Sequence, residues 1–422
     1  MDIQVSAAGA LIGLILAIVM ILERAAPVYA LLGGALIGGM VGGVSVVQTV
    51  NLMIDGASGM IPAVLRILAA GVLAGVLIES GAAATIANGI VNKIGQTRAL
   101  FALAVATMML TAVGVFVDVA VITVAPIALA IARKAELSKT AILLAMIGGG
   151  KAGNVMSPNP NAIAVAEAFH VPLSSVMAAG IIPGLFGLIV TYVLANRLST
   201  KGMAVERAEI ESQTEDTKPS FLVAVAAPII AIILLMLRPL FNIVIDPMIA
   251  LPIGGILGAI MMGKFRSLNE YAAKGLKKMT GVAVLLIGTG AIAGIISNSG
   301  LRHLLINGLD SLGLPAYVLA PASGMFMSAA TASTTAGSAV ASSVFGATIL
   351  DVGVASLAGA AMIHAGATVF DHLPHGSFFH ATAGSVAMQV NERLKLIPYE
   401  SLVGLAIAMV STVIFGVFKW FL

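Results

Sequence analysis

The sequence contains no cysteine, and only 10% of its 422 residues are charged. Without cysteine, the chain can form neither a disulfide nor a thiolate metal site. A soluble domain carries about 25% charged residues, because its surface must face water. This chain is instead 59% hydrophobic, with a mean hydropathy of +1.07, so its solvent must be lipid. We therefore exclude a soluble protein and expect an all-α integral membrane fold.

Basic residues exceed acidic ones only slightly, with 22 Lys and Arg against 19 Asp and Glu and a net charge of +3. They lie in loops between apolar runs, so orientation in a membrane explains them better than nucleic-acid binding does. Residues 1–4 lack the basic start of a cleaved signal peptide, and we expect the first apolar stretch to remain as a span. The lipid bilayer is therefore an expected partner, and nucleic acid is not.

Crossing a bilayer takes about 20 apolar residues in a helix. Eight stretches satisfy this length: 5–22, 28–47, 61–79, 176–196, 221–240, 247–263, 281–298 and 399–421. The stretches 99–133 and 314–350 are each long enough for two short spans or one re-entrant hairpin. Gly, Pro, Asn and His interrupt two more apolar stretches, 140–169 and 353–390. We expect about 10–14 membrane segments, some of them broken helices.

The chain divides into two related halves. Residues 197–219 form the only long run of mixed charge. A shift of 219 positions aligns the following identical residues: Gly56/Gly275, Met60/Met279, Gly71/Gly290, Ala74/Ala293, Gly75/Gly294, Ser80/Ser299, Gly81/Gly300, Asn88/Asn307 and Gly89/Gly308. We predict a first repeat at 1–196, a cytoplasmic linker at 197–219 and a second repeat at 220–422.

Equivalent loops of the two halves differ in charge. Segment 264–278 contains five basic residues, whereas its counterpart 48–60 contains none. Conversely, 133–139 contains three basic residues and the region of Asp351 contains none. Because basic loops face the cytoplasm, equivalent loops face opposite sides of the membrane. The pattern predicts inverted-topology repeats, which are typical of transporters that work by alternating access.

The first interruption, GGGKAGNVMSPNPNA at 148–162, has glycines on one side and prolines on the other. Irregular backbone inside a membrane is tolerated only in protein or beside a water-filled cavity, so a broken helix indicates a binding site. We assign its polar side chains to substrate binding: Lys151, Asn154, Ser157, Asn159 and Asn161. The Lys151 cation suits a carboxylate. The alternative is a proline-kinked span end with a snorkelling lysine.

The second interruption, at 364–385, carries Asp371, His372 and His375 together, and we place its Pro374 in register with Pro160. Ionisable residues inside a membrane are functional candidates because burying them is costly, and histidine titrates near neutral pH. We assign His372 and His375 to substrate binding. We assign His364 and Asp371 to the coupling ion. The alternative is a set of polar helix ends in an external loop.

The two hairpin-like stretches supply further polar groups. Asp118 lies within the apolar segment 111–119, where a carboxylate can bind a proton or a cation, and we assign it to the coupling ion. Hydroxyl-rich 331–343 could form an anion nest or coordinate Na⁺. Its residues assigned to substrate are Thr331, Ser333, Thr334, Thr335 and Ser338. The alternatives are a partnered structural aspartate and close helix packing through small residues.

At these segments the sequence resembles the gluconate permease family of bacterial gluconate:proton symporters, within the wider ion transporter superfamily. Segment 114–132 resembles that family's apolar run with one acidic residue and a closing proline, and Asp118 stands where the family has glutamate. Segment 156–164 resembles a Pro-His-Pro motif with Asn159 in the histidine position. Segments 331–340 and 364–379 resemble its Ser/Thr-rich stretch and its second break.

The resemblance implies a multi-pass protein of the bacterial inner membrane that carries sugar acids, hydroxyacids or D-serine with protons. It also suggests a homodimer through scaffold spans. We expect a proton-coupled symporter of a small organic carboxylate, with no cofactor and no metal site. Three alternatives stay open: a Na⁺-coupled symporter, a passive channel, and an intramembrane metalloenzyme. The metalloenzyme would use His364, Asp371, His372, His375 and His380, since His372-x2-His375 allows a shared metal.

Overall fold

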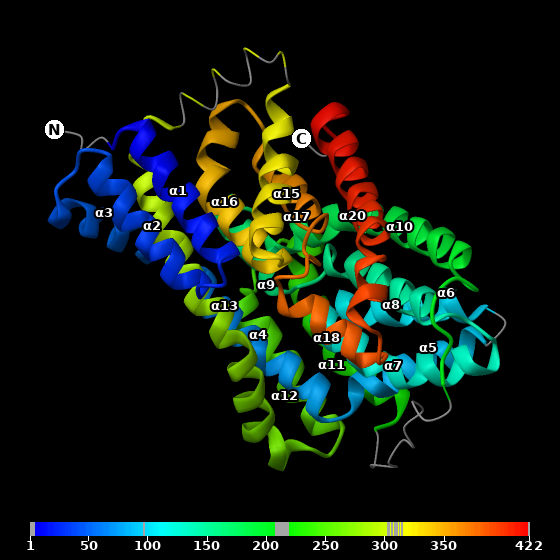
Figure 1. The fold of residues 1–422 in the computed structure, drawn as a ribbon. Coiled ribbons are helices and arrows are strands. Elements are labelled where there is room, and N and C mark those ends of the chain that lie inside the picture. Colours follow the sequence, from blue (N-terminus) through cyan, green and yellow to red (C-terminus); the bar gives the residue numbers. More distant parts are fainter. Residues whose placement is uncertain are drawn as a thin grey trace.

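The computed structural model describes residues 5–95, 98–206, 219–301, 304, 307, 311, 313 and 315–420, and within them the chain is almost entirely helical, which confirms the all-α prediction. The helices of the first half are α1 (Ala7–Leu22), α2 (Pro27–Val41), α3 (Val46–Ser58), α4 (Ile61–Glu79), α5 (Ala82–Ile94), α6 (Ala99–Ala112), α7 (Val117–Lys134), α8 (Lys139–Asn154), α9 (Pro160–Ala168) and α10 (Leu173–Arg197). Those of the second half are α11 (Phe221–Phe241), α12 (Pro247–Met261), α13 (Leu268–Ser297), α15 (Leu319–Thr331), α16 (Thr334–Asp351), α17 (Ser356–Gly366), α18 (Ser377–Ser385), α19 (Val390–Leu394) and α20 (Ile397–Thr412) (Figure 1).

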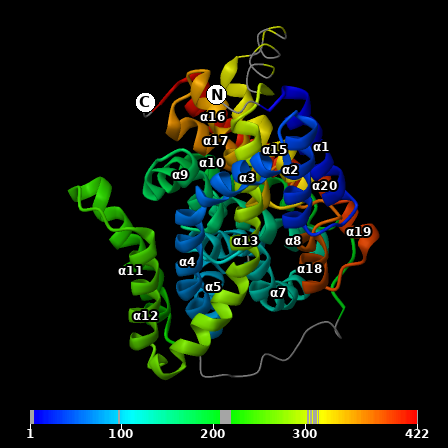
Figure 2. The same ribbon diagram turned by 90° about the vertical axis from the view of Figure 1, so that its left-hand side faces the viewer.

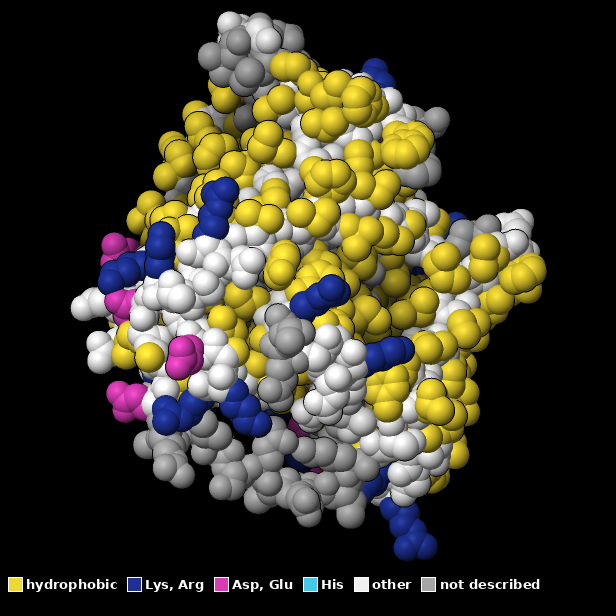
Figure 3. Space-filling model, turned by 90° about the vertical axis from the view of Figure 1, so that its right-hand side faces the viewer, with side chains coloured by type: hydrophobic (Ala, Val, Ile, Leu, Met, Phe, Trp, Pro, Cys, Tyr) yellow, Lys and Arg dark blue, Asp and Glu magenta, His cyan; other side chains and the backbone are white. Residues whose placement is uncertain are grey.

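Among the described residues, five helical stretches are long and apolar enough to cross a membrane: 61–79, 173–197, 221–238, 265–297 and 390–417. Four shorter apolar helices accompany them, including α1 and α2. Helices α11 and α12 lie together at one side (Figure 2), where α12 packs against α4. Large hydrophobic side chains such as Leu222 are exposed, and Figure 3 shows hydrophobic side chains over much of one face. Such a surface suits lipid.

Many helices of the first half recur at matching positions in the second, although α13 spans the positions of both α3 and α4. Helices α6 and α15 end at Ala112 and Thr331, which lie 219 positions apart, and α9 and α18 each have nine residues. However, Pro160 opens α9 and Ser377 opens α18, 217 positions later. The predicted register of Pro160 with Pro374 is therefore wrong. Helix α17 has 11 residues against 16 in α8, so the second break is longer and Pro374 lies inside it.

Glycine contacts between the halves are reciprocal. A Cβ added at Gly56 would overlap the backbone of Gly290, and a Cβ added at Gly275 would overlap that of Gly71. In the 219-residue alignment Gly275 is the equivalent of Gly56, and Gly290 is the equivalent of Gly71. The two contacts are therefore symmetry-equivalent, as in an interface with two-fold symmetry. An approximate two-fold axis thus relates the halves.

The helices at this contact run antiparallel. Gly71 in α4 packs against Met279 of α13, and Gly75, one turn further along α4, packs against Tyr271, two turns earlier in α13. A two-fold axis that relates antiparallel helices is perpendicular to them. For helices that cross a membrane, this axis lies in the membrane plane, and the halves then have inverted topology. The exact bounds of the halves stay a prediction, because 207–218 of the linker lie outside the described residues.

The glycine contact gives a stability prediction. Replacing Gly275 by alanine should destabilise the protein by about 1–3 kcal/mol, because the new methyl overlaps the main chain of Gly71. At Gly281, on the same helix, a Cβ would meet no described atom within 4 Å. Replacing it should change stability by less than about 1 kcal/mol, in the favourable direction. Thermal unfolding of the two purified variants measures the difference, and equal midpoints would contradict the close contact.

Segment 99–133 and the described residues 315–350 of segment 314–350 each form a helical hairpin, α6–α7 and α15–α16. With 14 residues, α6 is about 21 Å long, and with 13 residues α15 is shorter still. A full crossing of the hydrocarbon core needs about 30 Å. Both hairpins are therefore too short on one arm to cross, which favours the re-entrant alternative. Their tips meet the breaks α8–α9 and α17–α18 inside the protein (Figure 1).

Candidate substrate cavity

One cavity opens where the hairpin tips meet the helix breaks. Its empty volume is about 600 Å³, counted with its open mouth. Its lining residues are Phe116, Val117, Asp118, Asn154, Asn161, Ala332, Ser333, Thr334, Thr335, Asp371, Ser377 and Phe378. A shift of 217 converts residues 116–118 into 333–335, Asn154 into Asp371, and Asn161 into Phe378. Most of the lining therefore consists of equivalent residues from the two halves, and the cavity lies on the two-fold axis.

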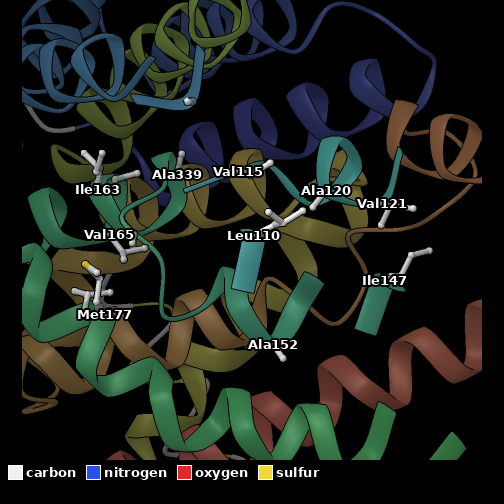
Figure 4. Packing of buried hydrophobic residues seen from close by; sticks show 14 of the residues in the cluster. Leu110, Val115, Ala120, Val121, Ile147, Ala152, Ile163, Val165, Met177 and Ala339 are labelled. Atoms are coloured by element: carbon white, nitrogen blue, oxygen red, sulfur yellow. The ribbon is translucent and has the colours of Figure 1, made fainter. Parts of the chain in front are cut away.

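Hydrophobic packing fixes the helices around this cavity. Ala120, Ile163 and Ala339 come from α7, α9 and α16, and they are buried in one continuous core (Figure 4). Each lies within about one turn of a residue that lines the cavity on the same helix. Protein interiors packed in this way resist deformation. The polar helix ends are therefore held in place by apolar contacts behind them.

Four helices begin at the cavity: α7, α9, α16 and α18. The first backbone N–H groups of a helix have no partner within it, and the dipole makes this end positive. Two ends have side-chain caps, since Asn159 accepts from the Ala162 amide at 3.0 Å and Ser333 from the Ala336 amide at 3.3 Å. Helices α7 and α18 have no side-chain cap from the residues described. The cavity therefore has two capped and two uncapped helix ends.

The capped ends also bond to each other across the halves. The hydroxyl of Thr335 in α16 donates to Asn161 Oδ1 in α9 at 2.5 Å. Asn161 and Asn159 in turn donate to Asn154 Oδ1, at 3.3 and 2.6 Å. The uncapped ends of α7 and α18 pack near each other on the other side of the axis. These uncapped ends leave the backbone donors of one half-site available to a ligand.

Asp118 lies in the first turn of α7 and lines the uncapped half-site. Within the described part of the chain its carboxylate has no hydrogen bond or ion pair. It differs in this respect from Asp371, the other carboxylate of the lining. The cavity lining contains no lysine, arginine or histidine among the residues described. No basic side chain of the described lining therefore compensates the charge of Asp118, which lies at the positive end of the α7 dipole.

Asp371 is paired with Lys151, which lies behind the cavity wall. Lys151 Nζ donates to Asp371 Oδ1 at 2.6 Å, and the Thr334 hydroxyl donates to Asp371 Oδ2 at 2.5 Å. The Lys151 side chain is fully buried and does not line the cavity. Sequence reasoning assigned Lys151 to the substrate. The structure places it against Asp371 instead, as the partner of a carboxylate in the other half.

A second buried ion pair extends this cluster. Glu400 and Arg393 are both fully buried and paired, and the Arg393 guanidinium lies 4.8 Å from the centre of the Phe379 ring. Glu400 Oε2 lies 4.0 Å from His372 Nδ1. Sequence reasoning missed this pair. Its available signal was Glu400 near the start of a predicted span, where an ionisable residue indicates a specific partner.

The remaining candidates lie away from the cavity lining. His375 donates to the Ala330 carbonyl at 3.2 Å, and Thr331 to the Met327 carbonyl at 2.8 Å. Three buried candidates have an atom without a hydrogen-bond partner in the described part of the chain: Ser157, Ser338 and His364. The cavity thus brings together Asp118, Asn154, Asn161, Ser333, Thr334, Thr335 and Asp371. It does not include Lys151, Ser157, Asn159, Thr331, Ser338, His364, His372 or His375.

The metalloenzyme alternative needs several histidines around one point. Within the described residues, no three His, Cys, Asp or Glu side chains are placed to hold a metal ion. His380 donates instead to the Pro374 carbonyl at 2.8 Å, and His375 to a main-chain carbonyl of α15. The spacing of His372 and His375 therefore does not produce a shared site.

Comparison with known proteins decides the family, because the model described as GntP family permease matches residues 3–418. The chain belongs to the GntP permease family. A protein of Haemophilus influenzae named "uncharacterized transporter" is 67% identical over 416 residues, 99% of each chain. A gluconate permease of Pseudomonas aeruginosa is 24% identical over 348 residues, covering 74% of this chain and 76% of the relative.

The fold of this GntP family member also has a solved counterpart. The crystal structure of the YdaH transporter of Alcanivorax borkumensis, reported to have an unusual topology, superposes with a TM-score of 0.67. The match covers 89% of this chain and 88% of the other at 16% sequence identity. This likeness concerns the fold alone. Together with the family match, it establishes a multi-pass membrane transporter fold.

Proposed function

We propose that this permease is a secondary active transporter that carries a small organic carboxylate together with a proton, by alternating access, across the bacterial inner membrane. The observation that supports an anionic substrate best is the meeting of four helix N-termini at one cavity. Each N-terminus carries roughly half a positive charge, and those of α7 and α18, which lack side-chain caps from the described residues, offer free backbone donors. These helix ends stabilise a bound carboxylate, although the described lining contains no lysine or arginine.

The uncapped ends of α7 and α18 are the proposed position of the substrate carboxylate. In the capped half-site one amide of each helix end is already satisfied, by Asn159 and by Ser333. Hydroxyl and amide side chains of the lining, on Asn154, Ser377 and Thr334, suit the hydroxyl groups of a sugar acid or short hydroxyacid. A gluconate-like substrate also agrees with the name of the Pseudomonas relative.

Proton coupling is supported by Asp118. Its carboxylate shares the proposed half-site and has no basic partner in the described part of the chain. Two carboxylates at close range in a site of low dielectric repel strongly. A proton on Asp118 removes this repulsion, so substrate and proton would enter and leave together. The inverted halves can then exchange conformations and expose the site to the opposite side.

Na⁺ coupling is the second candidate, because Asp118 lies in a cavity with neutral oxygen ligands from Asn154 and Thr334. A cation held there would neutralise Asp118 as a proton does. Replacing Na⁺ with choline distinguishes the two, since only a Na⁺-coupled transporter loses uptake in choline.

A binding experiment tests the anion site directly. Gluconate and short hydroxyacids should raise the thermal unfolding midpoint of the purified protein, whereas gluconamide, which has the same shape without the charge, should not. The stabilisation should grow as the pH falls and a proton becomes available to accompany the anion. Equal stabilisation by gluconamide would contradict an anionic site.

A further inference from the structure

The ammonium group of Lys151 has a complete coordination shell. Nζ lies 2.7 Å from the Thr368 carbonyl oxygen, 2.6 Å from Asp371 Oδ1 and 2.9 Å from His372 Nδ1. An ammonium has three donors, and here each has one acceptor. With Lys151 as the donor, His372 Nδ1 accepts; Nδ1 also lies 3.1 Å from Asp371 Oδ1, and Nε2 lies 3.1 Å from the Ile397 carbonyl oxygen and 3.2 Å from the Ser401 hydroxyl. The Glu400 carbonyl lies further out, at 3.5 Å.

All these acceptors belong to the second half, whereas Lys151 belongs to the first. Thr368, Asp371 and His372 lie in the break between α17 and α18. In transporters with inverted repeats, main-chain carbonyls freed by an unwound helix coordinate the coupling cation. Here Nζ is surrounded by one such carbonyl, that of Thr368, together with the Asp371 carboxylate and the Nδ1 nitrogen of His372. The site therefore has the chemistry of a monovalent-cation site, and the first half supplies its cation.

The equivalent position in the first half lacks these features. The residue equivalent to Lys151 is Thr368, and the residue equivalent to Asp371 is Asn154. Asn154 bonds to Asn159 and Asn161, and carries no charge to be compensated. Of these two equivalent positions, only the one in the second half holds a buried carboxylate and its internal cation.

We propose that Lys151 is a built-in monovalent cation whose ammonium fills a cation site formed by Thr368, Asp371 and His372. The second half then needs no coupling ion from solution. This inference deepens the proposed function, because it leaves the cavity residue Asp118 as the place where an external ion acts. It also predicts that a lysine-free site accepts a free cation. Alanine at 151 removes the three carbons and the nitrogen that propylammonium would replace.

The test uses purified full-length protein with Lys151→Ala, compared in choline, sodium and propylammonium chloride at equal ionic strength. Propylammonium, and more weakly Na⁺, should raise the unfolding midpoint of this variant by several degrees relative to choline. The wild-type midpoint should be the same in all three salts. In the double variant with Asp371→Asn the response should disappear, because the site has lost its carboxylate.

An equal midpoint in all three salts for a cooperatively unfolding Lys151→Ala protein would overturn the proposal. A response that persists with Asp371→Asn would overturn it too. If Lys151→Ala folds only when prepared with propylammonium or Na⁺, the proposal is supported. If it folds in none of the salts while the double variant folds, the cation site is rejected. This experiment contains no substrate, so its result does not depend on whether the protein transports a carboxylate. The proposed function and the proposed cation site can therefore be rejected independently of each other.

Discussion

Replacing Asp118 by asparagine should abolish proton-driven accumulation of the carboxylate while leaving its exchange across the membrane intact. Asparagine has nearly the shape of a protonated aspartate and is always neutral. The substrate anion therefore still binds at the helix ends, but no proton travels with it. With one proton per substrate, a gradient of one pH unit supports about tenfold accumulation, since one unit is worth about 1.4 kcal/mol. The variant should reach an inside-to-outside ratio of about one.

The measurement is uptake of labelled substrate into proteoliposomes with an imposed pH gradient, next to counterflow without a gradient. Asp55→Asn is the matched control, because Asp55 is exposed on α3 and does not line the cavity. It should accumulate substrate like the wild type. Tenfold accumulation by the Asp118 variant would show that another group carries the proton. Loss of counterflow as well would assign Asp118 a structural role instead.

Replacing Arg393 by methionine should destabilise the protein by about 3–5 kcal/mol, because it leaves the fully buried Glu400 carboxylate without its cation. The arginine also stacks on Phe379 and bonds to the Thr382 hydroxyl, so its loss removes packing too. The unfolding midpoint in detergent should fall by many degrees. Expression of folded protein should fall with it.

Two controls separate the buried charge from lost contacts. Lys395→Met, two residues away, removes an exposed cation paired with Glu392 and should change stability by less than about 1 kcal/mol. Adding Glu400→Gln to Arg393→Met removes the uncompensated charge and should recover a large part of the loss. If the double variant is as unstable as the single one, packing rather than charge explains the effect.

Several parts of the site could be predicted from the sequence. Glycine and proline interruptions located both breaks, because an irregular backbone in an apolar run needs a protein or aqueous environment. The tips of the hairpins were located by Asp118 and by the hydroxyl-rich segment at 331–343. These local signals are enough to place Asn154, Asn161 and Asp371 at the cavity, where the structure has them.

Pairings between the halves could not be predicted. Lys151 and Asp371 are 220 positions apart, and a lysine next to a binding segment is interpreted as a substrate ligand until its partner is known. The positions of the prolines also could not give the register of the second break relative to the first. Helix α17 ends early, at Gly366, and the extra unwound residues 367–371 include Thr368 and Asp371, which both accept from Lys151. The greater length of the second break thus accompanies the buried pair of Lys151 and Asp371, which has no counterpart at the equivalent position of the first half.

The most direct test of the central claim is proton movement driven by substrate. Wild-type protein is reconstituted into vesicles that contain a pH-sensitive dye, in a medium with choline and no Na⁺. Addition of gluconate or a short hydroxyacid outside should acidify the lumen, and gluconamide should not. Saturable acidification that is absent in the Asp118→Asn variant is the predicted result. Uptake of the carboxylate without any proton movement, or only after Na⁺ is added, would contradict proton symport.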